Sequence, residues 1–234
     1  MNAAFDSPTY PYERIMPSFL TFRGAEEIPY KLLTYLMDLP LPDGYEPVDD
    51  NARPRVRLMK YLWHDGAKPL GERLPTPKEK SSLLLDGNEP VVDTEVMRRK
   101  HPKGYRLYAQ RFWGEAQTEA KSTIKCYIGR IFSQTPFSAR IGVTFEILCS
   151  ADQDTATKTD AYSRAYDMEQ CIIEALLGVN TAGGGVCAFS RAAHADNGSR
   201  PAYDQSGTVV GRELKMSIQW AESEGADSDT VTAY

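Results

Sequence analysis

Residues 140–149 read RIGVTFEILC, and apolar side chains occupy every second position of this stretch. The apolar positions are Ile141, Val143, Phe145, Ile147 and Cys149. Because successive side chains of a β-strand point to opposite faces of its sheet, this alternation predicts a strand with one buried face and one solvent face.

A second stretch, TIKCYIGRIF at residues 123–132, alternates in the same way. Its predicted buried face comprises Ile124, Cys126, Ile128 and Phe132. The connector SQTPFSA has the length and composition of a hairpin loop, so the two strands are expected to pair antiparallel. A third alternating stretch at 211–220 places Leu214, Met216, Ile218 and Trp220 on one face. Less regular patterns predict further strands at 54–63, 105–113 and 185–191.

Two stretches repeat apolar side chains every three or four residues, which is typical of an amphipathic helix. They are residues 25–38, followed by Pro40, and residues 159–178, where Gly178 can end the helix. A sheet with one apolar face is stable only when other elements cover that face. The sequence therefore predicts an α+β fold, in which a one-sided antiparallel β-sheet is packed by two main helices.

Several segments lack any regular pattern. Residues 1–23 are expected to form an extended N-terminal arm, and residues 221–234 an acidic C-terminal tail. Between them we expect a single domain, 24–220, with a polar loop at 192–210 and a long insertion at 64–104. A segment of that length without its own core is unusual in a compact domain, so the insertion is expected to be disordered or to fold against another subunit.

The 234-residue chain has a net charge of −5, which argues against a protein that grips nucleic acid with its whole surface. Its apolar stretches are too short to span a bilayer, and the N-terminal residues lack a secretory pattern, so no membrane partner is expected. The cysteines lie in apolar patterns and form no CxxC pair; they are Cys126, Cys149, Cys171 and Cys187. We therefore expect buried thiols and synthesis in a reducing, intracellular compartment.

The stretch LLGVNTAGGGVCAFSR at residues 176–191 contains glycines that could surround a phosphate. A phosphate loop requires a strand, then the glycines, then a helix whose N-terminus supplies unpaired N–H groups. Here the glycines follow a predicted helix, and a helix C-terminus carries partial negative charge. We therefore expect a structural turn and no nucleotide cofactor. The glycines of this turn are Gly178, Gly183, Gly184 and Gly185.

Residues with catalytic or metal-binding chemistry are scattered along the chain. His64, His101 and His194 lie in separate predicted loops, and no cluster has the short spacing of a metal site. The acidic pairs at 26–27 and 49–50 are expected to be solvated surface charges, and no GxSxG motif occurs. We predict no catalytic, cofactor-binding or metal-binding residue, although an acid and a base could still be assembled from distant positions.

The densest basic run is MRRKHPKGYR at residues 97–106. Such a run could contact nucleic-acid phosphates, or it could pair with an acidic surface of this chain or of a neighbour. Because no interleaved aromatic platform accompanies it, we favour the protein surface. The candidate subunit-interface residues are Arg98, Arg99, Lys100 and Lys103.

The order of patterns in the second half resembles a known family. Two alternating strands, IKCYIGRIF and RIGVTFEILC, lead into DAYSRAYDMEQCIIEALLGVN, then AGGGVCAFSR and a final strand, GRELKMSIQW. With the upstream helix and the RPRVRLMKYL stretch, this order resembles the tail terminator and tail-to-head joining proteins of tailed bacteriophages. The similarity covers residues 25–62 and 105–220 and is one of pattern and order.

This resemblance implies an α+β subunit that forms a ring, commonly a hexamer, without catalytic residues. Such a ring caps the tail tube, docks onto a head-completion or connector protein and surrounds the DNA channel. The expected partners are further copies of this chain, the tail tube protein and the head-side protein, with non-specific proximity to DNA. The expected location is the neck or tail of the virion, after assembly in the cytoplasm of the bacterial host.

The chain is longer than the usual member of this family, mainly through its N-terminal arm and residues 64–104. That difference leaves open another neck, connector or tail-completion adaptor role. An enzyme or a small-molecule binding protein on an α+β scaffold is a further alternative, and it would require a deep pocket lined with convergent polar groups.

Overall fold

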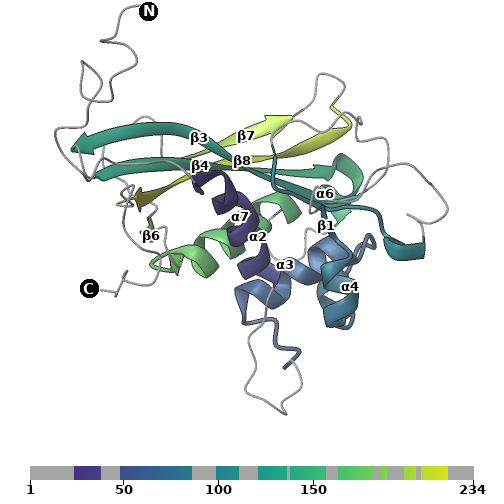
Figure 1. Ribbon diagram of the computed structural model, residues 1–234. Helices are drawn as coiled ribbons and strands as arrows, with labels where there is room; N and C mark the ends of the chain where they lie inside the picture. Colours follow the sequence, from purple (N-terminus) through teal and green to yellow (C-terminus); the bar gives the residue numbers. More distant parts are fainter. Residues whose placement is uncertain are drawn as a thin grey trace, which may run out of the picture.

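The computed structural model shows an α+β fold with one open, mixed β-sheet and helices on one of its faces (Figure 1). The strands follow the order β1-β2-β3-β4-β8-β6-β5, and β7 also pairs with β8. The structure describes residues 24–37, 48–85, 99–110, 121–135, 138–156, 163–181, 185–188, 198–203 and 207–220.

The secondary-structure elements have the following bounds. The strands are β1 (Leu84–Leu85), β2 (Leu107–Tyr108), β3 (Thr123–Thr135), β4 (Ser138–Ser150), β5 (Asn180–Thr181), β6 (Gly185–Ala188), β7 (Gly198–Tyr203) and β8 (Val209–Trp220). The helices are α2 (Ile28–Met37), α3 (Pro54–Trp63), α4 (Pro77–Ser81), α6 (Ala151–Ala156) and α7 (Arg164–Leu176). Two 3₁₀ helices, η1 (Ala25–Glu27) and η2 (Pro69–Gly71), complete the described elements.

Strands β3, β4 and β8 form the centre of the sheet and confirm the strands predicted from alternating patterns. β4 pairs antiparallel with both neighbours, so that Phe145 lies between Cys126 of β3 and Leu214 of β8. The five apolar positions that predicted the buried face of β4 are at most 1% exposed. The alternation in residues 140–149 therefore identifies the inner face of the sheet, which the helices cover.

The face predicted for Phe132 is wrong. We expected it on the buried face with Ile128, but the pairing of β3 with β4 shifts register between Ile128 and Ile131. A β-bulge places an extra residue in one strand, which reverses the face that each later side chain takes. Phe132 consequently lies opposite Arg140, on the outer face of the sheet, away from the helices.

Residues 54–63, predicted as a strand, form helix α3 instead. Pro54 begins the helix, where a proline is favoured because its missing N–H would have no partner there. Leu58 and Leu62 are four residues apart, which fits both the period of a strand and the i,i+4 spacing of a helix. The buried side chains of α3 are Val56, Leu58, Met59, Lys60, Tyr61, Leu62 and Trp63. Such a continuous buried run shows why the short pattern could not distinguish the two structures.

Both predicted helices are confirmed. Residues 25–38 form η1 followed by α2. The helix predicted at 159–178 becomes α7 with a later start, where the Ser163 hydroxyl accepts a hydrogen bond from the backbone N–H of Tyr166. Gly178 follows the end of α7 with a φ of 78°, a left-handed conformation that glycine adopts without strain.

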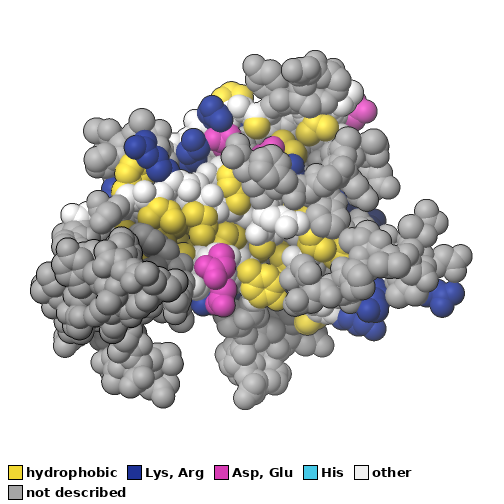
Figure 2. All heavy atoms as spheres, turned by 45° about the horizontal axis from the view of Figure 1, so that its top comes forward, with side chains coloured by type: hydrophobic (Ala, Val, Ile, Leu, Met, Phe, Trp, Pro, Cys, Tyr) yellow, Lys and Arg dark blue, Asp and Glu magenta, His cyan; other side chains and the backbone are white. Residues whose placement is uncertain are grey.

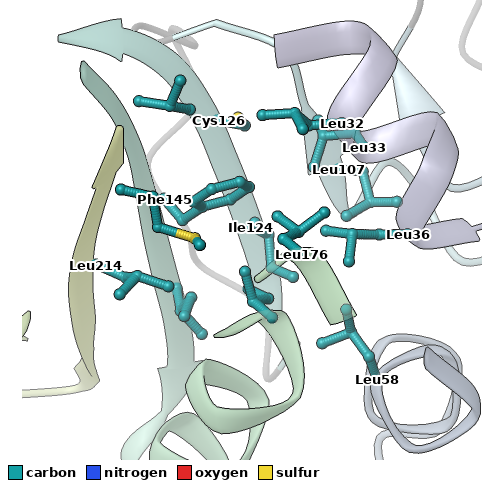
Figure 3. Close-up of a cluster of buried hydrophobic side chains, with 14 of the residues drawn as sticks. Leu32, Leu33, Leu36, Leu58, Leu107, Ile124, Cys126, Phe145, Leu176 and Leu214 are labelled. Atoms are coloured by element: carbon teal, nitrogen blue, oxygen red, sulfur yellow. The ribbon is translucent and has the colours of Figure 1, made fainter. Parts of the chain in front are cut away.

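Helices α2 and α7 pack directly on the inner face of the sheet, and α3 packs behind them against α7 (Figure 1). The main core lies between these helices and strands β3, β4 and β8 (Figure 3). The core side chains labelled in that view are Leu32, Leu33, Leu36, Leu58, Leu107, Ile124, Cys126, Phe145, Leu176 and Leu214. The predicted covering of a one-sided sheet by two main helices is thus confirmed, with α3 as an additional helix.

Part of the predicted insertion at 64–104 belongs to the fold. Residues 69–85 contain η2, α4 and β1, and Leu83 is fully buried in the main core. β1 pairs parallel with β2, and β2 pairs parallel with β3. The expectation of a segment without a core is therefore wrong for 69–85, because its short apolar run supplies both a strand and core contacts. Residues 86–98, with the predicted hairpin at 86–87, lie outside the described residues.

The predictions missed α6 and β7. α6 follows β4 directly, and β7 lies inside the segment predicted as a polar loop at 192–210. β7 pairs antiparallel with β8, but its sequence GSRPAY has no apolar alternation to mark it. An edge strand without apolar alternation leaves little trace in the sequence.

Helix α4 begins with a capping box. Thr76 accepts a hydrogen bond from the Glu79 N–H, while the Glu79 carboxylate accepts one from the Thr76 N–H at 2.8 Å. Arg73 donates two further hydrogen bonds to this carboxylate, of 2.7 and 2.5 Å. The hydrogen bond from Arg73, followed by those from Thr76, lowers the pKa of Glu79 to about 2.

This lowered pKa predicts an acid-dependent contribution to stability. Because the folded-state pKa lies below the unfolded value of about 4.3, the stabilisation is present above that value and is lost as the pH falls through 2. Glu79→Gln should be less stable than the wild type at pH 6 by less than about 1 kcal/mol, since the pair is exposed. Urea denaturation should show this difference shrinking towards pH 2, and a constant difference would contradict the prediction.

Candidate assembly surface

The densest group of charged side chains surrounds Asp65, in the loop after α3. Arg106 donates hydrogen bonds of 2.8 and 3.1 Å to the two carboxylate oxygens of Asp65, and Lys103 Nζ lies 3.6 Å from one of them. Gln153 of α6 donates to the Asp65 carbonyl oxygen at 3.1 Å. The Arg106 side chain is 4% exposed, so its charge depends on this carboxylate for neutralisation.

Arg164, at the start of α7, is completely buried beside this group. Its guanidinium donates hydrogen bonds to the His64 carbonyl at 3.3 Å, the Gly66 carbonyl at 2.6 Å and the Ser122 hydroxyl at 3.3 Å. Burial lowers the pKa of Arg164, but arginine remains a cation in proteins. We call these residues the Asp65 network; they are Asp65, Arg106, Ser122, Gln153 and Arg164. The network joins the loop after α3 to α6, α7 and the start of β3.

A second set of ion pairs joins the helices to each other and to the sheet. Arg57 and Tyr61 of α3 both donate hydrogen bonds to the carboxylate of Asp167 on α7. Burial and then the bond to Asp167 raise the pKa of Tyr61. Glu169 of α7 is 1% exposed and accepts a hydrogen bond from Arg212 of β8 at 3.0 Å. These buried carboxylates therefore hold elements together, and their charges are already paired.

The structure describes two of the four glycines of the predicted turn. Gly178 ends α7, and Gly185 begins β6 opposite Thr181 of β5. After α7 the chain therefore forms the short antiparallel pair of β5 and β6 before it reaches β8. The predicted turn connects the helix to this pair of strands. Gly183 and Gly184 lie outside the described residues.

The basic run at 97–106 does not act as one unit. Lys103 turns towards its own chain, where it pairs with Asp65 and lies 6.0 Å from the centre of the Trp63 ring. Arg99 and Lys100 are exposed, and Arg98 lies outside the described residues. A subunit interface at this run would consequently involve its N-terminal half.

The histidines make structural contacts where they are described. A ring nitrogen of His64 lies 2.8 Å from the Arg73 carbonyl, and His101 lies 2.6 Å from the Ser82 carbonyl. His194 is outside the described residues. Within the described ranges, no three His, Cys, Asp or Glu side chains gather as metal ligands.

Asp49 corrects the expectation that the acidic pairs are only solvated surface charges. Its carboxylate lies 2.6 Å from Nζ of Lys60, a side chain that is 4% exposed, and also accepts a hydrogen bond from the Leu74 N–H at 3.2 Å. Asp49 therefore neutralises a buried cation.

None of the described helices is long and apolar enough to cross a membrane.

Sequence reasoning missed the Asp65 network. WHDG at 63–66 indicated a turn, and a polar residue in a turn carries no sign of burial. Arg164 did offer a signal, because it precedes Ala165 and Met168 on the apolar side of α7. A charged residue at the edge of an apolar stripe can mark a buried polar contact.

The outer face of the sheet carries ion pairs within and between its strands. Figure 2 shows blue and magenta charged side chains among yellow hydrophobic ones in a view that brings the top of Figure 1 forward. Lys125 of β3 lies 3.8 Å from Glu146 of β4. Glu213 of β8 lies 2.7 Å from Arg200 of β7 and 3.3 Å from Lys215. These ion pairs place charged side chains on the face of the sheet that the helices leave uncovered.

The edge of β3 is open near the end of the strand. β2 pairs only with Ile124 and Lys125, and residues 131–135 have no strand partner on the side away from β4 in the part of the chain that the structure describes. Ile131 and Gln134 are exposed on this stretch. A sheet edge of this kind presents backbone N–H and C=O groups that can pair with another chain.

These features define the chain as an α+β protein with an open sheet, one helix-covered face and a partly open edge at β3. Comparison of this chain with protein-family models, with curated proteins and with solved structures found no match.

Proposed function

We propose that this chain is a structural subunit of the neck of a tailed bacteriophage, where it forms a ring that caps the tail tube and joins it to the head. The open edge of β3 at residues 131–135 is the observation that supports this proposal most. An edge of this length can bind a strand of a neighbouring subunit through backbone hydrogen bonds. The order of elements from β3 to β8, which resembles tail terminator proteins, supports the same role.

A closed ring requires two different surfaces of each subunit to meet. β3 lies towards one side of the sheet and β7 towards the other. Pro201 lies within β7 and has no N–H to donate, which weakens β7 as a pairing edge. We therefore expect the β3 edge to be the strand-pairing side of the subunit contact.

In the neck, one end of the ring would contact the tail tube protein and the other a head-completion or connector protein, with DNA passing through the centre. A connector or tail-completion adaptor would also assemble as a ring. The location of the subunit in a particle image distinguishes these two roles.

Purified protein is expected to form a ring, a hexamer by resemblance, which native mass spectrometry and negative-stain imaging would measure. Ile131→Lys places a charge on the β3 edge at a side chain that is 37% exposed, so it should weaken association about tenfold and leave the fold intact. Leu177→Lys is the matched control, because Leu177 is 55% exposed and belongs to the end of α7, not to β3.

Two results would count against the proposal. A chain that stays monomeric at the highest concentration reached, and that is missing from purified virions, would exclude a neck ring. Normal assembly of Ile131→Lys, equal to that of Leu177→Lys, would show that the β3 edge is not the contact.

A further inference from the structure

Basic, aromatic and amide side chains gather on the outer face of the sheet, near the end of β3 and the beginning of β4. Phe132 lies opposite Arg140, and Arg140 lies opposite Gln219 of β8. The Arg130 guanidinium stands 4.5 Å from the centre of the Phe132 ring, and Gln219 donates a hydrogen bond of 2.9 Å to Gln134. We call this group the hairpin patch; it comprises Arg130, Phe132, Gln134, Arg140 and Gln219.

The hairpin patch differs in charge from the rest of the outer face. Further along the sheet, Lys125 pairs with Glu146 and Arg200 pairs with Glu213. Among the described residues, no carboxylate pairs with Arg140, which is half-buried between two neighbouring strands. The guanidinium group of an arginine such as Arg140 can bind a carboxylate through paired hydrogen bonds.

The chain itself supplies a matching acidic segment. Residues 221–234 contain four carboxylates and no Lys, Arg or His; the acidic residues are Glu222, Glu224, Asp227 and Asp229. This segment begins directly after Trp220, which lies opposite Ala139 at the same end of the sheet as the hairpin patch. Fourteen residues can extend to about 46 Å, so the segment can reach back over the patch from its starting point.

We propose that the acidic C-terminal segment, 221–234, binds the hairpin patch of its own chain. Exposed ion pairs are individually weak and screened by salt. The segment is nevertheless tethered one residue beyond Gln219, which gives it a millimolar effective concentration at the patch. Binding within the chain therefore needs only modest affinity, and it should weaken as salt increases. Ring formation is not required for this contact, so the two proposals can fail separately.

A zero-length carbodiimide crosslink can test this contact in the full chain. Arg140→Lys keeps the positive charge and adds an amine that can form an amide bond with a nearby carboxylate. The lysine at position 140 should crosslink to the segment 221–234 at least about tenfold more than Lys78, an exposed lysine on α4. The yield should fall in concentrated salt, since screening shortens the reach of the charges.

Internal controls make either result interpretable. The pair Lys31–Glu27, with 3.0 Å between its charged atoms, should crosslink in every sample and report that the reaction works. If that pair crosslinks while position 140 stays at the level of Lys78, the proposal is wrong. An equal mixture of ¹⁵N-labelled and unlabelled protein adds a second criterion. Crosslinked peptides that are both labelled or both unlabelled support binding within one chain. A predominance of pairs with one labelled and one unlabelled peptide would show that a neighbouring chain supplies the segment, and this would overturn the proposal.

A nucleic acid is the competing occupant, because phosphates also bind arginine. The proposal would be overturned in favour of DNA by two results together. Position 140 would crosslink only at the background level, and the protein would bind duplex DNA in a way that Arg140→Glu abolishes and Lys78→Glu retains. Strong crosslinking that added duplex DNA does not reduce would support the acidic segment.

Discussion

Arg164→Met is expected to lower the free energy of unfolding by about 3–5 kcal/mol, the cost of breaking a buried polar network from one side. Methionine keeps much of the length and volume of arginine but donates no hydrogen bond. The carbonyls of His64 and Gly66 and the hydroxyl of Ser122 would each lose a donor. Because Arg164 is completely buried, water cannot replace those bonds without opening the junction of α3 and α7.

Urea denaturation followed by tryptophan fluorescence would measure this loss, since Trp63 lies in the loop-facing end of α3. Arg53→Met is the matched control: the Arg53 side chain is 56% exposed and its charge lies 4.0 Å from Asp50. The control should change stability by less than about 0.5 kcal/mol. Similar effects of the two substitutions would mean that the network does not support the fold.

Asp65 offers an independent test of the same network. Asp65→Asn retains the shape of the side chain but leaves the buried charge of Arg106 without its anion. Combined with Arg164→Met, it should cost less than the sum of the two single changes, because both act on one connected group. Strict additivity would separate the two residues into different structural units.

The outcome of sequence-based prediction depends on whether a pattern was long and unambiguous. Residues 140–149 predicted β4 and its buried face correctly, since five alternating apolar positions fit no other period. Residues 54–63 were wrongly predicted as a strand, because the spacing of Leu58 and Leu62 fits the period of a strand as well as that of a helix. The face of Phe132 was predicted wrongly for a different reason. A β-bulge depends on the pairing of two strands, and the sequence of one strand does not reveal it.

The candidate surfaces were less predictable than the fold. Gly178 could be placed because a helix end and a glycine occur together in the sequence. The contact between Asp65 and Arg106 joins positions 41 residues apart, and that between Arg164 and Gly66 joins positions 98 apart. No local pattern encodes such pairs, because they form only when the loop after α3 reaches the start of α7. The open edge of β3 likewise depends on how few residues of β2 pair with it.

Gly211→Ala is the second substitution expected to have a large effect, with a loss of about 3 kcal/mol or more, at the upper end of the cost of overpacking. Gly211 of β8 lies opposite Leu148 of β4, at a very close approach of the two strands. A Cβ atom at position 211 would lie 2.9 Å from the carbonyl carbon of Ile147 and closer still to its oxygen, so β8 would have to move away from β4.

A series of glycine substitutions separates this contact from a general effect of alanine. At Gly142 an added Cβ would lie 3.0 Å from the Arg130 carbonyl oxygen, so Gly142→Ala should cost less than Gly211→Ala. At Gly71 no atom lies within 4 Å, so Gly71→Ala should change stability by less than about 0.5 kcal/mol. Denaturation midpoints would rank the three variants, and soluble yield would report a Gly211→Ala protein that fails to fold. Equal stability of Gly211→Ala and Gly71→Ala would contradict the prediction. It would mean that β4 and β8 can move apart at Gly211 without loss of stability, although they pair continuously from Ala139 to Ser150.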